Sequence, residues 1–80
     1  MSMTRVKFTY EQGMIKRPII YDMGRMFNIV TNIRRADVRE DMGWVVLELE
    51  GIEKEVQRGL DWVVKQGVRV DPIAGDVVEG

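Results

Sequence analysis

The chain has 80 residues, of which 45% are hydrophobic and 31% are charged. It carries 12 basic and 13 acidic side chains and contains neither cysteine nor histidine. This length allows one small domain with one core, and the composition is that of a folded protein. Without cysteine and histidine there are no disulfides, no thiolate metal ligands and no imidazole base. We therefore expect no enzymatic activity, no metal and no other cofactor.

Charge and hydropathy predict a cytoplasmic protein that neither binds nucleic acid nor inserts into a membrane. Apolar runs are a few residues long, against roughly 20 for a bilayer span, and no secretory segment opens the chain. The isoelectric point of about 5.4 argues against a nucleic-acid surface. Residues 1–39 carry a net charge of +5 and residues 40–80 one of −6. Because both halves enter one sheet in the fold predicted below, we expect ion pairs between neighbouring strands.

The first predicted elements are a strand over residues 4–10 and a helix that begins near Pro18. In the strand, apolar side chains alternate with polar ones, which is typical of a half-buried strand. Proline suits a first helical turn because its missing N–H has no partner there. The helix carries an apolar stripe at the 3.6-residue period, expected in the core. Its members are Ile19, Ile20, Met23, Met26, Phe27 and Val30.

A β-hairpin over residues 33–50 follows, with its turn at Asp41-Met42-Gly43. Alternation on both sides of the turn predicts one apolar and one charged face. The predicted pairs are Ala36 with Leu47, Val38 with Val45, Arg35 with Glu48 and Arg39 with Trp44. The last two would form a salt bridge and a cation–π contact. A bulge at Gly43 is the alternative that would shift this register.

A second helix over residues 52–66 and a short strand that Pro72 stops complete the pattern. Gly67 is expected to end the helix in the left-handed conformation. Gly59, inside the helix, predicts close packing against a neighbour, with a ligand contact as the less favoured alternative. Residues 74–80 are expected to be loosely ordered. The apolar stripe of this helix is predicted to consist of Ile52, Val56, Leu60, Val63 and Val64.

The order strand, helix, strand, strand, helix, strand predicts an α+β, ferredoxin-like fold in one domain, with an ordered core over residues 4–73. Two helices would cover one face of a four-stranded antiparallel sheet. We expect binding or self-association at the other face or at an edge strand. That open face would present Arg5, Lys7, Thr9, Arg35, Asp37, Arg39, Trp44, Val46, Glu48, Arg69 and Asp71.

Three segments of the chain resemble the NIL domain: residues 32–38 (NIRRADV), 43–51 (GWVVLELEG) and 67–70 (GVRV). Asn32 and Ile33 match the family's Asn-Ile-Leu signature, whereas Arg34 stands where leucine is usual. The family occurs at the C-terminus of the ATPase subunit of methionine importers, beside ferredoxin modules and as small separate proteins. The resemblance implies a ferredoxin-like regulatory module that binds methionine near a homodimer interface.

Two hypotheses follow. In the first, the chain is a homodimeric, non-catalytic sensor of a sulfur-containing amino acid such as methionine. In the second, it is an accessory protein that docks onto an enzyme or ferredoxin of sulfur amino-acid metabolism and binds no small molecule, which Arg34 slightly favours. Asn32 has a structural alternative as well, since asparagine often satisfies backbone groups at a junction. The candidate site residues are Asn32, Ile33, Arg34, Met42, Gly43 and Trp44.

Overall fold

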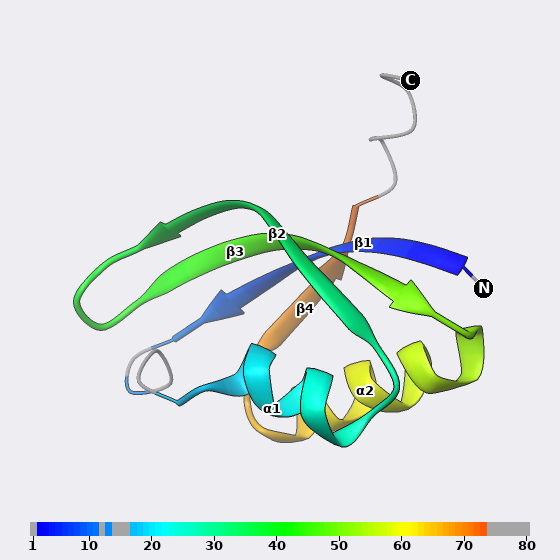
Figure 1. Cartoon of the computed structure of the whole chain (residues 1–80). Helices are drawn as coiled ribbons and strands as arrows, with labels where there is room; N and C mark the ends of the chain where they lie inside the picture. Colours follow the sequence, from blue (N-terminus) through cyan, green and yellow to red (C-terminus); the bar gives the residue numbers. More distant parts are fainter. Residues whose placement is uncertain (1, 12, 14–16, 74–80) are drawn as a thin grey trace.

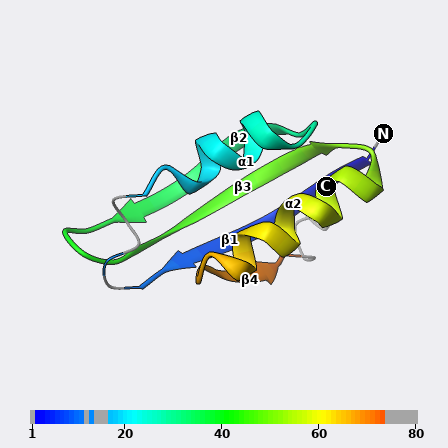
Figure 2. The ribbon, with the colours of Figure 1, turned by 90° about the horizontal axis from the view of Figure 1, so that it is seen from below.

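The computed structural model describes residues 2–11, 13 and 17–73. Its elements are β1 (Ser2–Tyr10), α1 (Ile19–Met26), β2 (Val30–Val38), β3 (Gly43–Gly51), α2 (Glu53–Lys65) and β4 (Arg69–Pro72). The strands form one antiparallel sheet in the order β2-β3-β1-β4, and both helices lie against one face of it (Figures 1 and 2). This confirms the predicted ferredoxin-like α+β fold. The segment 74–80, expected to be loosely ordered, lies outside the described residues.

The core lies between the helices and the two central strands. Alternate residues of β1 and β3 point into it, because side chains of a strand alternate between the faces of the sheet. The core is formed by Val6, Phe8, Tyr10, Ile19, Met23, Ile29, Val45, Leu47, Leu49, Val56, Val63 and Val68. The predicted inward row of β1 and the predicted parity of β3 are thus confirmed.

The predicted stripe of the first helix is wrong at its C-terminal end. Helix α1 ends at Met26, which is exposed, and Val30 belongs to β2 and is exposed too. The reason is that Phe27 has an extended backbone (φ −121°, ψ 158°), so the helical period stops there. Ile29, beyond the turn, supplies the buried side chain instead.

The predicted stripe of the second helix is wrong at Ile52 and Val64, which are both exposed. Ile52 precedes α2 in an extended conformation, and Gly59 lies on the buried face. A Cβ on Gly59 would lie 2.5 Å from Cδ1 of Ile29, so the expected close packing is confirmed. Gly67 has a φ of 99°, which confirms the left-handed helix end.

The predicted register of the hairpin is wrong. The observed partners of Ala36 and Val38 are Val45 and Gly43, because the connection over residues 39–42 places Val38 opposite Gly43. Farther from the turn, β2 also contains a bulge between Ile33 and Arg35. Arg34 is the extra residue, so the bulge lies in mid-strand rather than at Gly43. Alternation alone cannot place a bulge, since the pattern on each side of it stays regular.

The shifted register replaces both predicted contacts of the open face. Glu48 forms its salt bridge with Arg5 on β1 rather than with Arg35. The cation over the Trp44 ring is Lys7, with Nζ 5.2 Å from the ring centroid, rather than Arg39. The Arg5–Glu48 pair joins the basic first half of the chain to its acidic second half, as expected, whereas Arg58–Glu55 and Arg69–Asp71 are local pairs.

Candidate functional site

The six predicted site residues fall into two groups on the β2–β3 hairpin. Asn32, Ile33 and Arg34 lie in the middle of β2, where Asn32 pairs with Glu48. Residues 42–44 lie at the turn, where Gly43 pairs with Val38. At about 3.3 Å per residue, Glu48 and Gly43 are roughly 16 Å apart along β3. The structure therefore does not bring the six residues into one pocket.

The mid-strand group is exposed on the outer edge strand. Asn32 shares the open face with its partner Glu48, whereas Ile33 pairs with Leu47 on the helix side and is still 55% exposed. Within the described part of the chain, the Asn32 side-chain amide makes no hydrogen bond. The structural alternative for Asn32 finds no support in this geometry, and the amide is accessible to a ligand.

Basic side chains determine the electrostatics around Asn32. A hydrogen bond from Arg5, then the positive charges of Arg5 and Arg34, lower the pKa of the Glu48 carboxyl below its usual value, although its partial desolvation acts in the opposite direction. Glu48 is thus held as a carboxylate next to Asn32. Arg34, exposed at the bulge, adds a guanidinium to this part of the sheet.

The turn group lines a cavity of about 300 Å³, here called the hairpin cavity. Its wall contains opposite charges, because Nε of Arg39 lies 3.4 Å from Oδ1 of Asp37. Both side chains remain substantially exposed. The wall also contains the half-buried Trp44 and the exposed Met42. The lining residues are Tyr10, Glu11, Asp37, Arg39, Met42, Gly43 and Trp44.

Gly43 is required by the backbone of the turn. A Cβ there would lie 2.7 Å from the carbonyl oxygen of Asp37 and 2.9 Å from Cα of Val38. The Arg39 N–H donates to the carbonyl oxygen of Met42 at 2.8 Å and closes the turn. Glycine therefore lets the two strands approach, which keeps the Asp37–Arg39 pair close to Trp44.

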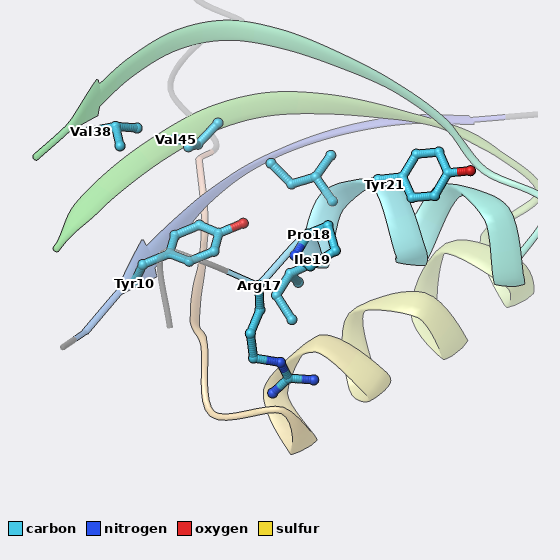
Figure 3. A pocket seen from close by; sticks show the side chains of 8 residues that line it. Tyr10, Arg17, Pro18, Ile19, Tyr21, Val38 and Val45 are labelled. Atoms are coloured by element: carbon cyan, nitrogen blue, oxygen red, sulfur yellow. The ribbon is translucent and has the colours of Figure 1, made fainter. Parts of the chain in front are cut away.

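A second cavity, of about 200 Å³, lies between the turn end of the hairpin and the beginning of α1 (Figure 3). We call it the Tyr10 cavity, although Tyr10 also borders the hairpin cavity. The sequence predicted Tyr10 only as a core residue. A tyrosine at the end of an inward-facing row was the available signal, because its hydroxyl needs a polar partner. The cavity is lined by Tyr10, Arg17, Pro18, Ile19, Ile20, Tyr21, Val38 and Val45.

The described residues form neither a metal-binding cluster of acidic side chains nor a membrane-spanning helix. Over the described ranges 2–11, 13 and 17–73, acidic side chains form no group of three or more that could hold a metal ion. None of the described helices is long and apolar enough to cross a membrane.

Known proteins resemble this chain in fold more than in sequence. The C-terminal domain of an ABC transporter ATP-binding protein from Enterococcus faecalis superposes with a TM-score of 0.78 at 19% identity, over 89% of this chain and 83% of that one. The designed protein Foldit4 reaches 0.56 at 9% identity, over 90% and 94% of the two chains. The designed protein Ferredog-Diesel reaches 0.54 at 16% identity, over 91% and 85%.

Among the curated proteins, no sequence matches the chain significantly. The sequence profile of the NIL domain, in contrast, matches residues 4–72, which is nearly all of the described core. This agrees with the resemblance of the Asn32 segment, the β3 segment and the Gly67 segment. The chain belongs to the NIL domain family.

Proposed function

We propose that this NIL domain is a non-catalytic regulatory module that binds a small amino acid in the hairpin cavity. The observation that carries the proposal is the Asp37–Arg39 pair in the wall of that cavity, next to Trp44 and Met42. A carboxylate and a guanidinium side by side match the ammonium and carboxylate groups of a free amino acid. The apolar part of the wall matches a side chain.

The Asp37–Arg39 pair can open for such a ligand at little cost. Its hydrogen bonds are long, at 3.4 Å for both nitrogen–oxygen contacts, and both residues are exposed. Exposed ion pairs contribute only about 0 to 1 kcal/mol to stability. A ligand that offers each group a closer partner would therefore displace the pair.

Size and wall chemistry favour a thioether side chain. An apolar cavity of about 150 Å³ holds benzene, so about 300 Å³ is sufficient for a small amino acid. Trp44 and the Met42 thioether form an apolar and polarisable surface, and sulfur packs well against an aromatic ring. We therefore propose methionine or a related sulfur-containing amino acid as the ligand. The fold neighbour from an ABC transporter ATP-binding protein is consistent with regulation of transport.

The test is thermal unfolding with and without methionine, homocysteine or cysteine. A ligand at about 100 times its Kd adds roughly 2.7 kcal/mol, which raises Tm by about 10 °C or more in a domain of this size. The variant Arg39→Gln should weaken binding by roughly tenfold or more, because it removes a charged partner of the carboxylate. No Tm shift with any of the three amino acids would reject this function.

The chain offers a matched control. Arg69 pairs with Asp71 at the same spacing as Arg39 and Asp37, with similar exposure, but does not line the hairpin cavity. The variant Arg69→Gln should therefore leave binding unchanged. The variant Asn32→Ala locates the site: if it abolishes binding while Arg39→Gln does not, the ligand binds at mid-strand and the hairpin cavity is excluded.

Edge strand β2 supports a second candidate function, in which the domain pairs with a second copy or docks onto an enzyme or ferredoxin. The strand exposes Val30, Ile33 and Val38, and its outer backbone edge is not paired within the sheet. Exposed apolar edge strands favour association with another chain. Sedimentation should show a dimer that Ile33→Glu dissociates. If the protein is a monomer and none of the amino acids changes its Tm, docking onto a different protein is favoured.

A further inference from the structure

Tyr10 combines a buried ring with a hydroxyl that has no hydrogen-bond partner among the described residues. Its side chain is 5% exposed, at the last inward-facing position of β1. Over the described residues, its hydroxyl makes no hydrogen bond. The hydroxyl is not a fully buried atom, so it keeps accessible surface and can bond a molecule in the neighbouring cavity. Figure 3 shows the hydroxyl directed into the Tyr10 cavity, between the strands and the beginning of α1.

Most of the other described residues that line this cavity are apolar. Val38 and Val45 come from the hairpin, and Pro18 and Ile20 come from the beginning of α1. Arg17 also lines the cavity, but its Nη2 donates a 2.7 Å hydrogen bond to Oε1 of Gln66. In Figure 3 the guanidinium points away from Tyr10 and the strands. Among the described lining residues, no charged group is thus directed into the cavity toward a ligand.

The Tyr10 hydroxyl can act as a hydrogen-bond donor at neutral pH. Burial raises the pKa of Tyr10 to about 12, so the phenol stays protonated. The volume of about 200 Å³ exceeds the roughly 150 Å³ of an apolar cavity that holds benzene. Apolar walls with a single directional polar group are typical of a small-molecule site.

We propose that the Tyr10 cavity binds a small, uncharged, mainly apolar molecule that carries one hydrogen-bond acceptor for the Tyr10 hydroxyl. This site is separate from the proposed amino-acid site, although Tyr10 borders both cavities. The ligand classes differ, because the hairpin cavity offers charged groups, whereas the Tyr10 cavity offers the phenol of Tyr10. The hydroxyl of Tyr21, the other tyrosine in the wall, points away from Tyr10 (Figure 3). The proposal therefore does not depend on amino-acid binding.

The experiment uses acetophenone and isopropylbenzene, which have nearly the same shape but differ in the carbonyl oxygen. Amide and methyl NMR signals are followed during titration of the full chain. We expect both probes to shift signals of Val38, Val45 and Ile20. The variant Tyr10→Phe should weaken acetophenone binding by about tenfold, the usual effect of one lost hydrogen bond, and change isopropylbenzene binding less than about twofold.

Two further variants complete the test. Tyr21→Phe makes the same chemical change on an exposed tyrosine at the cavity mouth and should change neither affinity. Val38→Trp fills the cavity from an exposed wall position and should weaken both probes by more than about tenfold. The proposal fails if neither probe binds, if the shifts map elsewhere, or if Tyr10→Phe affects both probes equally. If Tyr10→Phe does not fold, Val38→Trp alone decides: the proposal is overturned if this variant binds both probes as tightly as the unsubstituted chain does.

Discussion

The two ends of the β2–β3 hairpin differ in how closely they are packed against the rest of the domain. At the packed end, defined by Asn28, Ile29 and Gly51, the chain lies tightly against α2, and a Cβ on Gly51 would meet the carbonyl oxygen of Asn28 at 2.8 Å. At the turn end, residues 38–43, the hairpin borders both cavities. Dense packing at one end stabilises the domain, so the other end can retain open apolar surface for binding.

The largest expected difference is between the losses in the free energy of unfolding caused by substitution at a core position and at a turn-end position. Leu47 is fully buried in the centre of β3, and Leu47→Ala should lower the free energy of unfolding by about 2 to 5 kcal/mol. Val38, 58% exposed in the neighbouring strand, should lose less than about 1 kcal/mol on change to alanine. Urea unfolding measures both. Equal losses would show that the turn end is packed as densely as the core.

Gly43 should be the most sensitive position of the turn end. In Gly43→Ala the new Cβ would meet backbone atoms of Asp37 and Val38, which cannot rotate away. We expect a loss of about 1 to 3 kcal/mol in the free energy of unfolding. Gly24→Ala is the control, since its Cβ would have no atom closer than 3.7 Å and alanine favours a helix by about 1 kcal/mol. If Gly43→Ala unfolds with the same free energy as the unsubstituted chain, the close approach of the two strands at Gly43 is contradicted.

At the packed end, Gly59→Ala should cost about 1 to 2 kcal/mol despite the higher helix propensity of alanine. The clash is with the Cδ1 atom of Ile29, which is buried and has little room to move. Ile29→Val removes that atom, so the double variant should recover part of the loss. Additive losses in the double variant, measured by urea unfolding, would show that the two sites are not in contact.

The smallest expected effect concerns pH. The Arg5 hydrogen bond lowers the pKa of Glu48 from 4.5, and the Asn28 N–H, then Arg58, lowers that of Glu55. A lowered pKa in the folded state gives stability that is complete above the unfolded value and is lost as pH falls through the folded value. The free energy of unfolding should therefore fall below about pH 5, and less steeply in Glu48→Gln or Glu55→Gln. If the free energy of unfolding of both variants falls with pH as steeply as that of the unsubstituted protein, this linkage is contradicted.

The sequence predicted the elements of the candidate site better than their spatial relation. Gly43 and Trp44 were placed correctly at the hairpin turn, and both line a cavity. Asn32 was expected near them, but it lies on β2 opposite Glu48, which is five residues along β3 from Gly43. The Asp37–Arg39 pair was missed as a site, because the predicted register placed Arg39 rather than Asp37 opposite Trp44.

The amino-acid sequence by itself determined the element order, the buried rows of β1 and β3, the left-handed Gly67 and the need for close packing at Gly59. These features follow from local periodicity and from the conformations each residue permits. Only the tertiary structure decided the bulge at Arg34, the exposure of Met26, Val30 and Val64, and the two cavities at the turn end. A bulge preserves the alternation on both of its sides, so the local sequence pattern does not reveal it. Burial depends on which neighbouring elements cover a face, so the local pattern does not determine it either.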